Sequence, residues 1–297
     1  MRWRRARATA TSTCPSARSR AGTARSTSSH RRREPRGRRH AGHRAHRAAV
    51  CSGPGRGAGR RRPGRVGRRG PTPLEAAATL SEAAVGERLV MSFGTAGGVK
   101  DRVAGGRPVD LVVLPPARLD ELVGLSLVSP EGRVPLGTVR LGAAVRAGAP
   151  RPAIATEADV RAALLAAPSI GLADPASGAT TGIYFAKLIG DLGLAETLKP
   201  RIRLYTDGTA AVEALARGEV ALAAGQISEI RPVVGADLVG PLPEAMQLRT
   251  VYAAGVSTHA ARPEAARAVI AFLRSIRMAP AFSAAGFDPP PDGSPPP

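Results

Sequence analysis

Three hydroxyl residues, Ser177, Thr180 and Thr181, lie between an apolar run at 169–173 and a helical pattern at 183–189. A helix that begins directly after a strand leaves its first backbone N–H groups without intrahelical partners, and these groups carry a partial positive charge. Hydroxyls at the same place add hydrogen-bond donors, so the loop that includes Gly178 could hold an anion. The structural alternative is that one of these residues only caps the helix.

Two further turns have a similar composition. The first, at 94–98, contains Thr95, Ala96 and Gly97, where glycines let the backbone come close to a ligand and Thr95 supplies a hydroxyl. The second begins at Gln226, directly after an apolar run. Because ligands of α/β sheets bind beyond the carboxyl ends of the strands, these turns could surround one ligand if the fold brings them together.

The elements that must position these turns alternate along the chain from residue 71 onward. Apolar runs predict strands, and helical periods between them predict helices, so the sequence indicates an α/β architecture with largely parallel sheets. Thr156 and Asp159 have the spacing of a capping box at the start of a helix. The predicted strands are 88–92, 109–114, 138–147, 201–205, 220–225, 237–239 and 248–253, and the predicted helices are 74–85, 99–103, 117–123, 156–166, 183–189, 194–198, 209–217 and 264–274.

The net charge of +20 is unevenly distributed. Residues 1–70 hold 22 arginines and one acid, Glu34, while the rest of the chain is nearly neutral. A segment with so few large apolar residues cannot offset its ordering entropy, so we expect residues 1–72 to be a disordered basic leader. Its many arginines and absent lysines also suit a GC-rich frame translated out of phase. A nucleic-acid-binding arm is the third alternative, although aromatic residues do not alternate with the basic ones.

Targeting signals are not readable in the sequence. The longest apolar stretch near the start, 48–51, is shorter than the core of a signal peptide. The tail at 288–297 contains six prolines and is expected to be disordered or extended.

Several stretches together resemble a type 2 periplasmic solute-binding protein of an ABC importer, with the molybdate- and tungstate-binding proteins as the nearest relatives. No one motif is very specific, but their order and spacing are. The stretches are Ser-Phe-Gly-Thr-Ala-Gly-Gly at 92–98, Val-Asp-Leu-Val-Val-Leu at 109–114, Gly-Leu-Ala-Asp-Pro at 171–175, Gly-Glu-Val-Ala-Leu-Ala-Ala-Gly at 218–225, and the closing helix at 263–274.

The resemblance implies a two-lobed fold that closes on a small anion. Lobe one would comprise residues 73–147 and 248–287, and lobe two residues 148–247, with crossovers near 145–149 and 247–251. It further implies an ABC permease as partner, a monomeric protein, a location in the periplasm or cell envelope, and neither a cofactor nor nucleic acid as a ligand.

The resemblance also assigns the turns their roles. Thr95, with Ala96 and Gly97, would contact an oxyanion or a small organic anion from lobe one. Ser177, Gly178, Thr180 and Thr181 would contribute hydroxyls and backbone N–H groups from lobe two. Gln226 stands where the family pattern has a tyrosine, which puts molybdate itself in doubt. The family's first strand and its ligand loop have no recognisable counterpart before residue 73, so we expect them to be missing or scrambled.

Two other classes of function are open. The effector domain of a LysR-type regulator has the same two-lobed fold, but the basic segment shows no helix-turn-helix pattern. An enzyme is not expected, because no Ser/His/Asp set, acid pair or metal-ligand cluster is evident and His259 is isolated.

Overall fold

The computed structural model describes residues 46–50, 75, 80, 86, 89–131 and 133–290. Most of the predicted basic leader, nearly all of the helix predicted at 74–85 and the tail beyond residue 290 lie outside these residues. Among the helices of the described part, none is long and apolar enough to cross a membrane.

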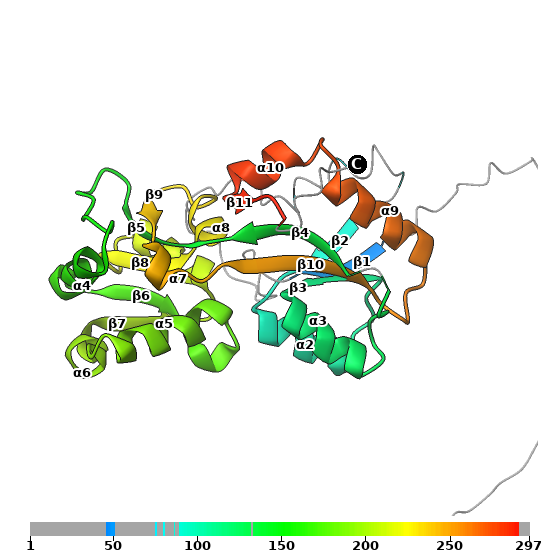
Figure 1. The fold of residues 1–297 in the computed structure, drawn as a ribbon, viewed down its shortest axis with the longest axis horizontal. Helices are drawn as coiled ribbons and strands as arrows, with labels where there is room; N and C mark the ends of the chain where they lie inside the picture. Colours follow the sequence, from blue (N-terminus) through cyan, green and yellow to red (C-terminus); the bar gives the residue numbers. More distant parts are fainter. Residues whose placement is uncertain are drawn as a thin grey trace, which may run out of the picture. The chain divides into compact units, whose positions relative to one another are not determined.

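Two sheets, each covered by its own helices, form the two lobes (Figure 1). The first sheet has the order β11-β4-β10-β3-β1-β2, in which β1, β2 and β3 are parallel and β10 runs antiparallel to β3 and β4. Its strands are β1 (His46–Val50), β2 (Leu89–Ser92), β3 (Leu111–Leu114), β4 (Val134–Val139), β10 (Thr250–Val256) and β11 (Phe287–Asp288).

The helices of the first lobe are α2 (Ala96–Ala104), α3 (Pro116–Gly124), α9 (Pro263–Arg274) and α10 (Ala279–Ala284). Figure 1 shows α2 and α3 below β3 and β10, with α9 and α10 above the strands. Because β3 is fully buried, its four apolar residues can belong to one continuous core with side chains of α3 and α9.

The second sheet has the order β7-β6-β8-β5-β9. Its strands are β5 (Leu141–Arg146), β6 (Ile170–Ala173), β7 (Ile202–Tyr205), β8 (Leu222–Gln226) and β9 (Ala236–Pro241), and its helices are α4 (Glu157–Ala166), α5 (Thr180–Asp191), α6 (Ala195–Leu198), α7 (Gly208–Ala216) and α8 (Ile227–Ile230). Short 3-10 turns occupy Pro175–Ser177, Lys199–Arg201 and Glu244–Met246.

Alternate residues of β5 contact different cores, as expected for side chains that point to opposite faces of a strand. Leu141 and Val145 pack with α4 and α5, whereas Ala144 packs with α7. The capping box predicted at the start of α4 is confirmed, since the Asp159 carboxylate accepts from Thr156 N at 2.9 Å and the Thr156 hydroxyl accepts from Asp159 N at 3.1 Å.

The chain first crosses between lobes at Arg140, and the predicted single strand at 138–147 is wrong in this respect. β4 ends at Val139 and pairs with β10, while β5 begins at Leu141 and pairs with β8. One apolar run therefore contributes a strand to each of the two sheets. The first boundary between lobe one and lobe two lies near residue 140 instead of residue 147.

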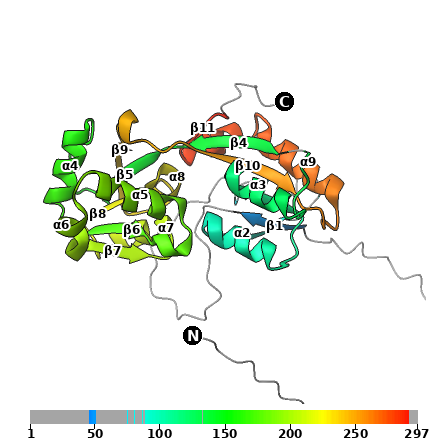
Figure 2. The same ribbon diagram turned by 60° about the horizontal axis from the view of Figure 1, so that its bottom comes forward.

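The return crossover, between β9 and β10, is joined to the first by the side chain of Gln247. Its Oε1 accepts from Leu141 N at 2.5 Å, and its Nε2 donates to Leu141 O at 3.2 Å and to Leu242 O at 3.0 Å. The amide thus pairs with backbone groups of both crossing segments. Figure 2 shows the strands β4 and β10, which lead into and out of these segments, side by side.

Two expectations at the ends of the fold also need correction. A strand, β1, is present at His46–Val50, inside the predicted leader, and pairs in parallel with β2 and β3. Asp288, assigned to the disordered tail, belongs to β11, which pairs with β4. Its carboxylate forms an ion pair with Arg140 at 2.8 Å, which a compositional argument about prolines does not detect.

Candidate functional site

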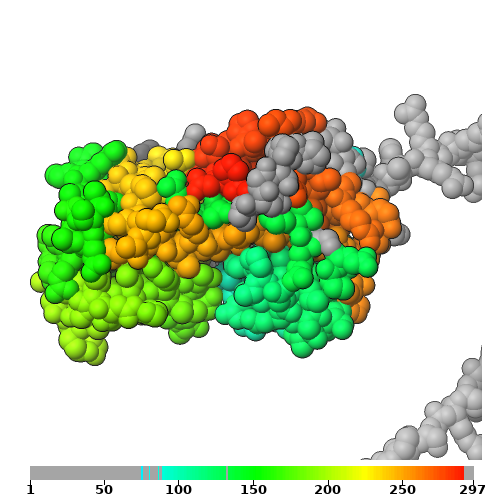
Figure 3. All heavy atoms as spheres, in the orientation of Figure 1, coloured from blue at the N-terminus to red at the C-terminus, as the bar shows by residue number. Residues whose placement is uncertain are grey.

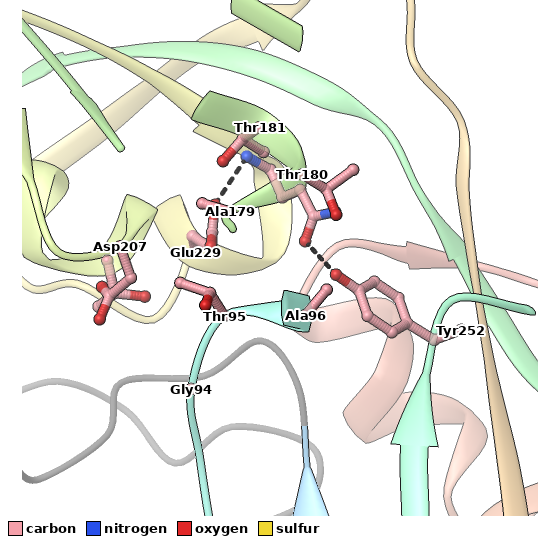
Figure 4. Close-up of a pocket in the computed structure, with 11 residues that line it drawn as sticks. Gly94, Thr95, Ala96, Ala179, Thr180, Thr181, Asp207, Glu229 and Tyr252 are labelled. Carbon is pink, nitrogen blue, oxygen red and sulfur yellow. Dashed lines mark hydrogen bonds between the residues drawn. The ribbon is translucent and has the colours of Figure 1, made fainter. Parts of the chain in front are cut away.

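The connections from four strand ends, β2, β6, β7 and β8, to four helix starts, α2, α5, α7 and α8, converge on one cavity, as the carboxyl ends of α/β sheets commonly do. Figure 4 shows Thr95 and Ala96 near Ala179 and Thr180, with Asp207 at one side and Tyr252 at the other. The volume of this cavity is about 20 Å³, which is room for about one water molecule. Its lining consists of Gly94, Thr95, Ala96, Ala179, Thr180, Thr181, Asp207, Thr209, Gln226, Glu229 and Tyr252.

The cavity is small because the lobes touch beside it. Gly97 N donates to Gly178 O at 3.1 Å, and the Thr95 hydroxyl donates to Ser177 O at 2.6 Å. A Cβ on Gly97 would lie 3.0 Å from the Cα of Gly178, so only glycine fits this close approach without displacement. Figure 3 shows atoms of the two lobes in contact along this boundary.

Five of the eight predicted site residues line the cavity: Thr95, Ala96, Thr180, Thr181 and Gln226. The other three, Gly97, Ser177 and Gly178, lie at the contact between the lobes instead. The Ser177 hydroxyl donates to Asp174 O at 2.7 Å, so in this structure it stabilises its own turn. Thr95 has a double role, because it lines the cavity while its oxygen caps α2 and its proton bonds the other lobe.

Helix α5 begins at the loop for which the sequence predicted anion donors, and this start lines the cavity. Its N-cap is Ala179, whose side chain cannot accept a hydrogen bond, so the first backbone N–H groups are not capped by that residue. Thr181 is 4% exposed and Ala179 is also buried, which places this helix start at the wall of the cavity. The helix N-terminus is therefore electropositive on the side of the cavity.

Gln226 ends β8 with its side chain almost wholly buried, at 1% exposure. Its Oε1 accepts a hydrogen bond from the Tyr252 hydroxyl at 2.8 Å, whereas its Nε2 has no hydrogen-bond partner among the residues that the structure describes. A buried amide nitrogen without an acceptor is costly, and its position on the cavity suits an acceptor atom of a ligand.

Glu229 lies one turn further along α8 and is also buried. Its Oε2 accepts from Gln226 N at 3.1 Å. Burial raises the pKa of Glu229 from its ordinary value of 4.5 to about 7; the charge of Asp207 adds to the rise, and hydrogen bonds from the backbone of Gln226 and Gly208 oppose it. A carboxyl group in this range can both release and accept a proton near neutral pH.

The start of α7 positions both Asp207 and Glu229. The Asp207 carboxylate caps this helix by accepting from Ala210 N at 2.8 Å. At the next position, a Cβ on Gly208 would lie only 2.1 Å from Glu229 Oε2, so the close packing of Glu229 requires glycine there.

Sequence reasoning missed Asp207, Thr209, Glu229 and Tyr252. The first two had a usable signal, since a polar Asp-Gly-Thr turn follows the strand at 202–205 as the other site turns follow theirs. Glu229 lies in the turn that begins at Gln226, but nothing in the sequence indicates that its side chain is buried. Tyr252 lies within a strand and is 3% exposed, and a strand interior gives no sequence signal for a site.

Comparison with known proteins assigns the chain to one family. Residues 71–288 match the family described as bacterial extracellular solute-binding protein. The chain is 33% identical over 195 residues to an aconitate isomerase from a Pseudomonas species, covering 65% of this chain and 72% of that protein. The expectation that the chain is not an enzyme is contradicted by this relative, which is named as an isomerase.

Solved structures share the fold at low sequence identity. The periplasmic molybdate-binding protein of Azotobacter vinelandii is 16% identical with a TM-score of 0.63, covering 82% of this chain and 99% of that chain. The sulfate-binding protein of Mycobacterium tuberculosis is 18% identical with a TM-score of 0.60, covering 82% and 86%. These likenesses establish the predicted two-lobed fold of type 2 periplasmic binding proteins, whereas the ligands in their names differ.

Proposed function

The chain belongs to the family of bacterial extracellular solute-binding proteins, and from this premise we propose that it binds a small organic carboxylate of the aconitate class between its lobes and isomerises it by proton transfer. The observation that carries the proposal is the meeting of donors and a buried acid on one cavity: the start of α5, the Nε2 atom of Gln226, and Glu229.

The donors favour an anion. The uncapped start of α5 offers backbone N–H groups, and Thr180 and Thr181 add hydroxyls beside it. Hydrogen bonds to a charged group contribute about 1.5–3 kcal/mol each, so several such donors give useful affinity. No lysine or arginine is among the described residues that line the cavity, which suits recognition by neutral donors.

The acids favour a carboxylate over molybdate or tungstate. Asp207 and Glu229 both line the cavity, and a compact dianion held between them would have charged oxygens facing both acids, with no apolar part to place against either. An organic acid has a carbon skeleton that can lie against Glu229 while its own carboxylates reach the donors at α5 and Gln226. The isomerase among the relatives of the chain supports the same class of ligand.

Glu229 is the proposed acid–base group. In an aconitate, moving the double bond requires a proton to leave the methylene carbon and a proton to return to the former vinylic carbon. A carboxylate at Glu229 would take the first proton and return it, so it ends the reaction as it began. The raised pKa of Glu229, caused mainly by burial, makes both protonation states accessible at neutral pH.

The ligand must enter through a separation of the lobes. A cavity of about 20 Å³ holds about one water molecule, which is far less than a tricarboxylate needs. We propose that the contact between Gly97 and Gly178 opens for binding and that the lobes close less tightly on the ligand.

A second function rests on the family alone. Its members are solute-binding components of ABC importers, so delivery of the same carboxylate to a permease from the periplasm is the transport alternative. The two functions differ in one property, because transport requires release of an unchanged ligand.

The test uses the full chain, with trans-aconitate, cis-aconitate, molybdate and sulfate as ligands. Thermal-shift and calorimetric titrations measure binding, and ultraviolet absorbance follows interconversion of the two aconitates. We expect aconitate to bind and to be interconverted by the wild type. Glu229→Gln should lose at least about a hundredfold in turnover while still binding, as expected for removal of a general base.

The matched control is Glu196→Gln, whose side chain is 89% exposed and should change neither property. Binding without interconversion would leave transport as the function. Binding of molybdate or sulfate alone would overturn the carboxylate proposal.

A further inference from the structure

We infer that Tyr252 is a positioning residue that fixes the side-chain amide of Gln226, so that the cavity presents a hydrogen-bond donor and selects an acceptor oxygen of its ligand at this point. The inference deepens the proposed function and rests on it, because it concerns the same cavity. It specifies which chemical group of the ligand can form a hydrogen bond with the side chain of Gln226.

The pair joins the two lobes. Gln226 ends β8 of the five-stranded sheet, and Tyr252 lies in β10 of the six-stranded sheet. The Tyr252 hydroxyl donates to Gln226 Oε1 at 2.8 Å, and the two residues are 3% and 1% exposed (Figure 4). Water competes little for this bond, so it should hold the amide in one orientation.

The orientation of the amide decides what the cavity offers. An amide side chain has one acceptor oxygen and one nitrogen with two donors. With Oε1 engaged by Tyr252, the group left for a ligand is Nε2, which is buried and has no hydrogen-bond partner in the described part of the chain. A ligand oxygen would satisfy Nε2, whereas a ligand N–H or ammonium would leave two donors facing each other.

The same residue also holds the proposed acid. The backbone N–H of Gln226 donates to Glu229 Oε2 at 3.1 Å. Two hydrogen bonds thus link Tyr252 to Gln226 and Gln226 to Glu229. The first uses the side chain of Gln226 and the second uses its backbone. A carboxylate anchored at Nε2 would therefore lie at a fixed place relative to Glu229.

A purely structural role for Tyr252 makes a different prediction. If its hydroxyl only stabilised the contact between the two lobes, Tyr252→Phe would lower thermal stability and leave ligand preference unchanged. A positioning role predicts weaker binding of the anion and a higher KM, while kcat, which depends on Glu229, changes little.

The experiment compares the wild type with Tyr252→Phe, Gln226→Glu and Tyr184→Phe, each in the full chain. Calorimetry measures the affinity of each for three anions: trans-aconitate, its saturated analogue propane-1,2,3-tricarboxylate, and molybdate. Tyr184 is the matched control because it is a partly buried tyrosine of α5 that packs edge-on against Phe185 and does not line the cavity. We expect Tyr252→Phe to weaken binding of the preferred anion about tenfold, as loss of one hydrogen bond to a buried group does, and Tyr184→Phe to leave it unchanged.

Gln226→Glu gives a second readout that does not depend on folding stability. The new carboxylate can still accept from Tyr252 but has no donor for the ligand, so binding at pH 8 should fall by about a hundredfold or more. Lowering the pH protonates the new carboxyl and restores a donor, so binding by this variant should recover relative to the wild type.

Equal affinities of the wild type, Tyr252→Phe and Tyr184→Phe would overturn the inference while leaving the proposed function intact. Binding of molybdate in place of the carboxylates, weakened by Tyr252→Phe, would support the inference and overturn the proposed ligand. Failure of the wild type to bind any of the three anions would overturn both.

Discussion

The two lobes contribute different kinds of group to the cavity. The second lobe provides the start of α5, the two acids and the amide of Gln226, which are groups that could recognise or transform a ligand. The described part of the first lobe provides Gly94, Thr95, Ala96 and Tyr252. Of these, Thr95 and Tyr252 donate hydrogen bonds to residues of the second lobe. Under the proposed function, the second lobe would recognise the ligand and the first lobe would close on it.

The largest expected effect would come from disturbing the second lobe at Gly208. Gly208→Ala places a methyl group 2.1 Å from Glu229 Oε2, so the buried acid or the start of α7 must move. We expect a loss of about 3 kcal/mol in the free energy of unfolding, as in severe overpacking, measured by urea denaturation. Gly190→Ala, in α5 with open space around its Cβ, is the control and should stabilise the fold by about 0.5–1 kcal/mol. Equal stabilities of the two variants would contradict the packing at Glu229.

Glu229 should make the stability of the second lobe depend on pH. The folded chain keeps the Glu229 proton up to about pH 7, whereas the unfolded chain releases it near pH 4.5. Folding binds this proton between the two values, so its stabilising effect is complete below pH 4.5 and is lost as the pH rises through 7. The shift corresponds to at most about 3 kcal/mol. Denaturation at pH 5 and pH 8 should show this fall in the wild type and not in Glu229→Gln; parallel curves would refute the shift.

The first lobe should affect closure more than stability. Gly97→Ala forces its methyl group to within 3.0 Å of the Cα of Gly178 and should hold the lobes slightly apart. We expect ligand affinity to be kept or to rise by up to about tenfold, equivalent to about 1.4 kcal/mol, with an unchanged unfolding midpoint, because the methyl group disfavours only the tightly closed, ligand-free state. Gly124→Ala, at the end of α3 with no atom near its Cβ, should bind like the wild type. A tenfold loss of affinity in Gly97→Ala would show that the close contact is part of the bound state.

The smallest effect is expected at the crossover between the lobes. Asp288→Asn removes the ion pair with Arg140, whose partners have side chains 35% and 38% exposed. Solvent screening limits such a pair to about 0.2–1 kcal/mol. Asp191→Asn, which removes the exposed pair with Lys187 within α5, is the control and should cost about 0.3–0.5 kcal/mol. Chemical denaturation in low and high salt would measure both; a loss at Asp288 much above 1 kcal/mol would indicate that β11 detaches as a whole.

Local signals explain most of what the sequence predicted correctly. The fully buried strand β3 is a continuous apolar run, and the capping box at Thr156 uses residues three positions apart. The loop before α5, which lines the cavity, is recognisable because a strand, a small polar turn and a helix follow one another in sequence. In each case the residues involved are neighbours along the chain.

Contacts between distant residues explain the rest. Arg140 divides one apolar run between two sheets because β4 pairs with β10 and β5 pairs with β8, each more than 75 residues later in the chain. The tail residue Asp288 was misassigned since its partner, Arg140, lies 148 positions away. The strand β1 was missed because only its pairing with β2 and β3 distinguishes His46–Val50 from the basic segment around it.

The sequence by itself determined the two-lobed α/β fold and the loops that could meet an anion, since hydrophobic period, capping and turn chemistry are properties of short segments. Only the tertiary structure decided how those loops are used. It turned Gly97 and Gly178 into a contact between the lobes and buried Glu229 beside Gly208. It also brought Tyr252 to Gln226 from another sheet. Burial and close approach depend on how distant segments pack, and packing is what raises the pKa of an acid and fixes the orientation of an amide.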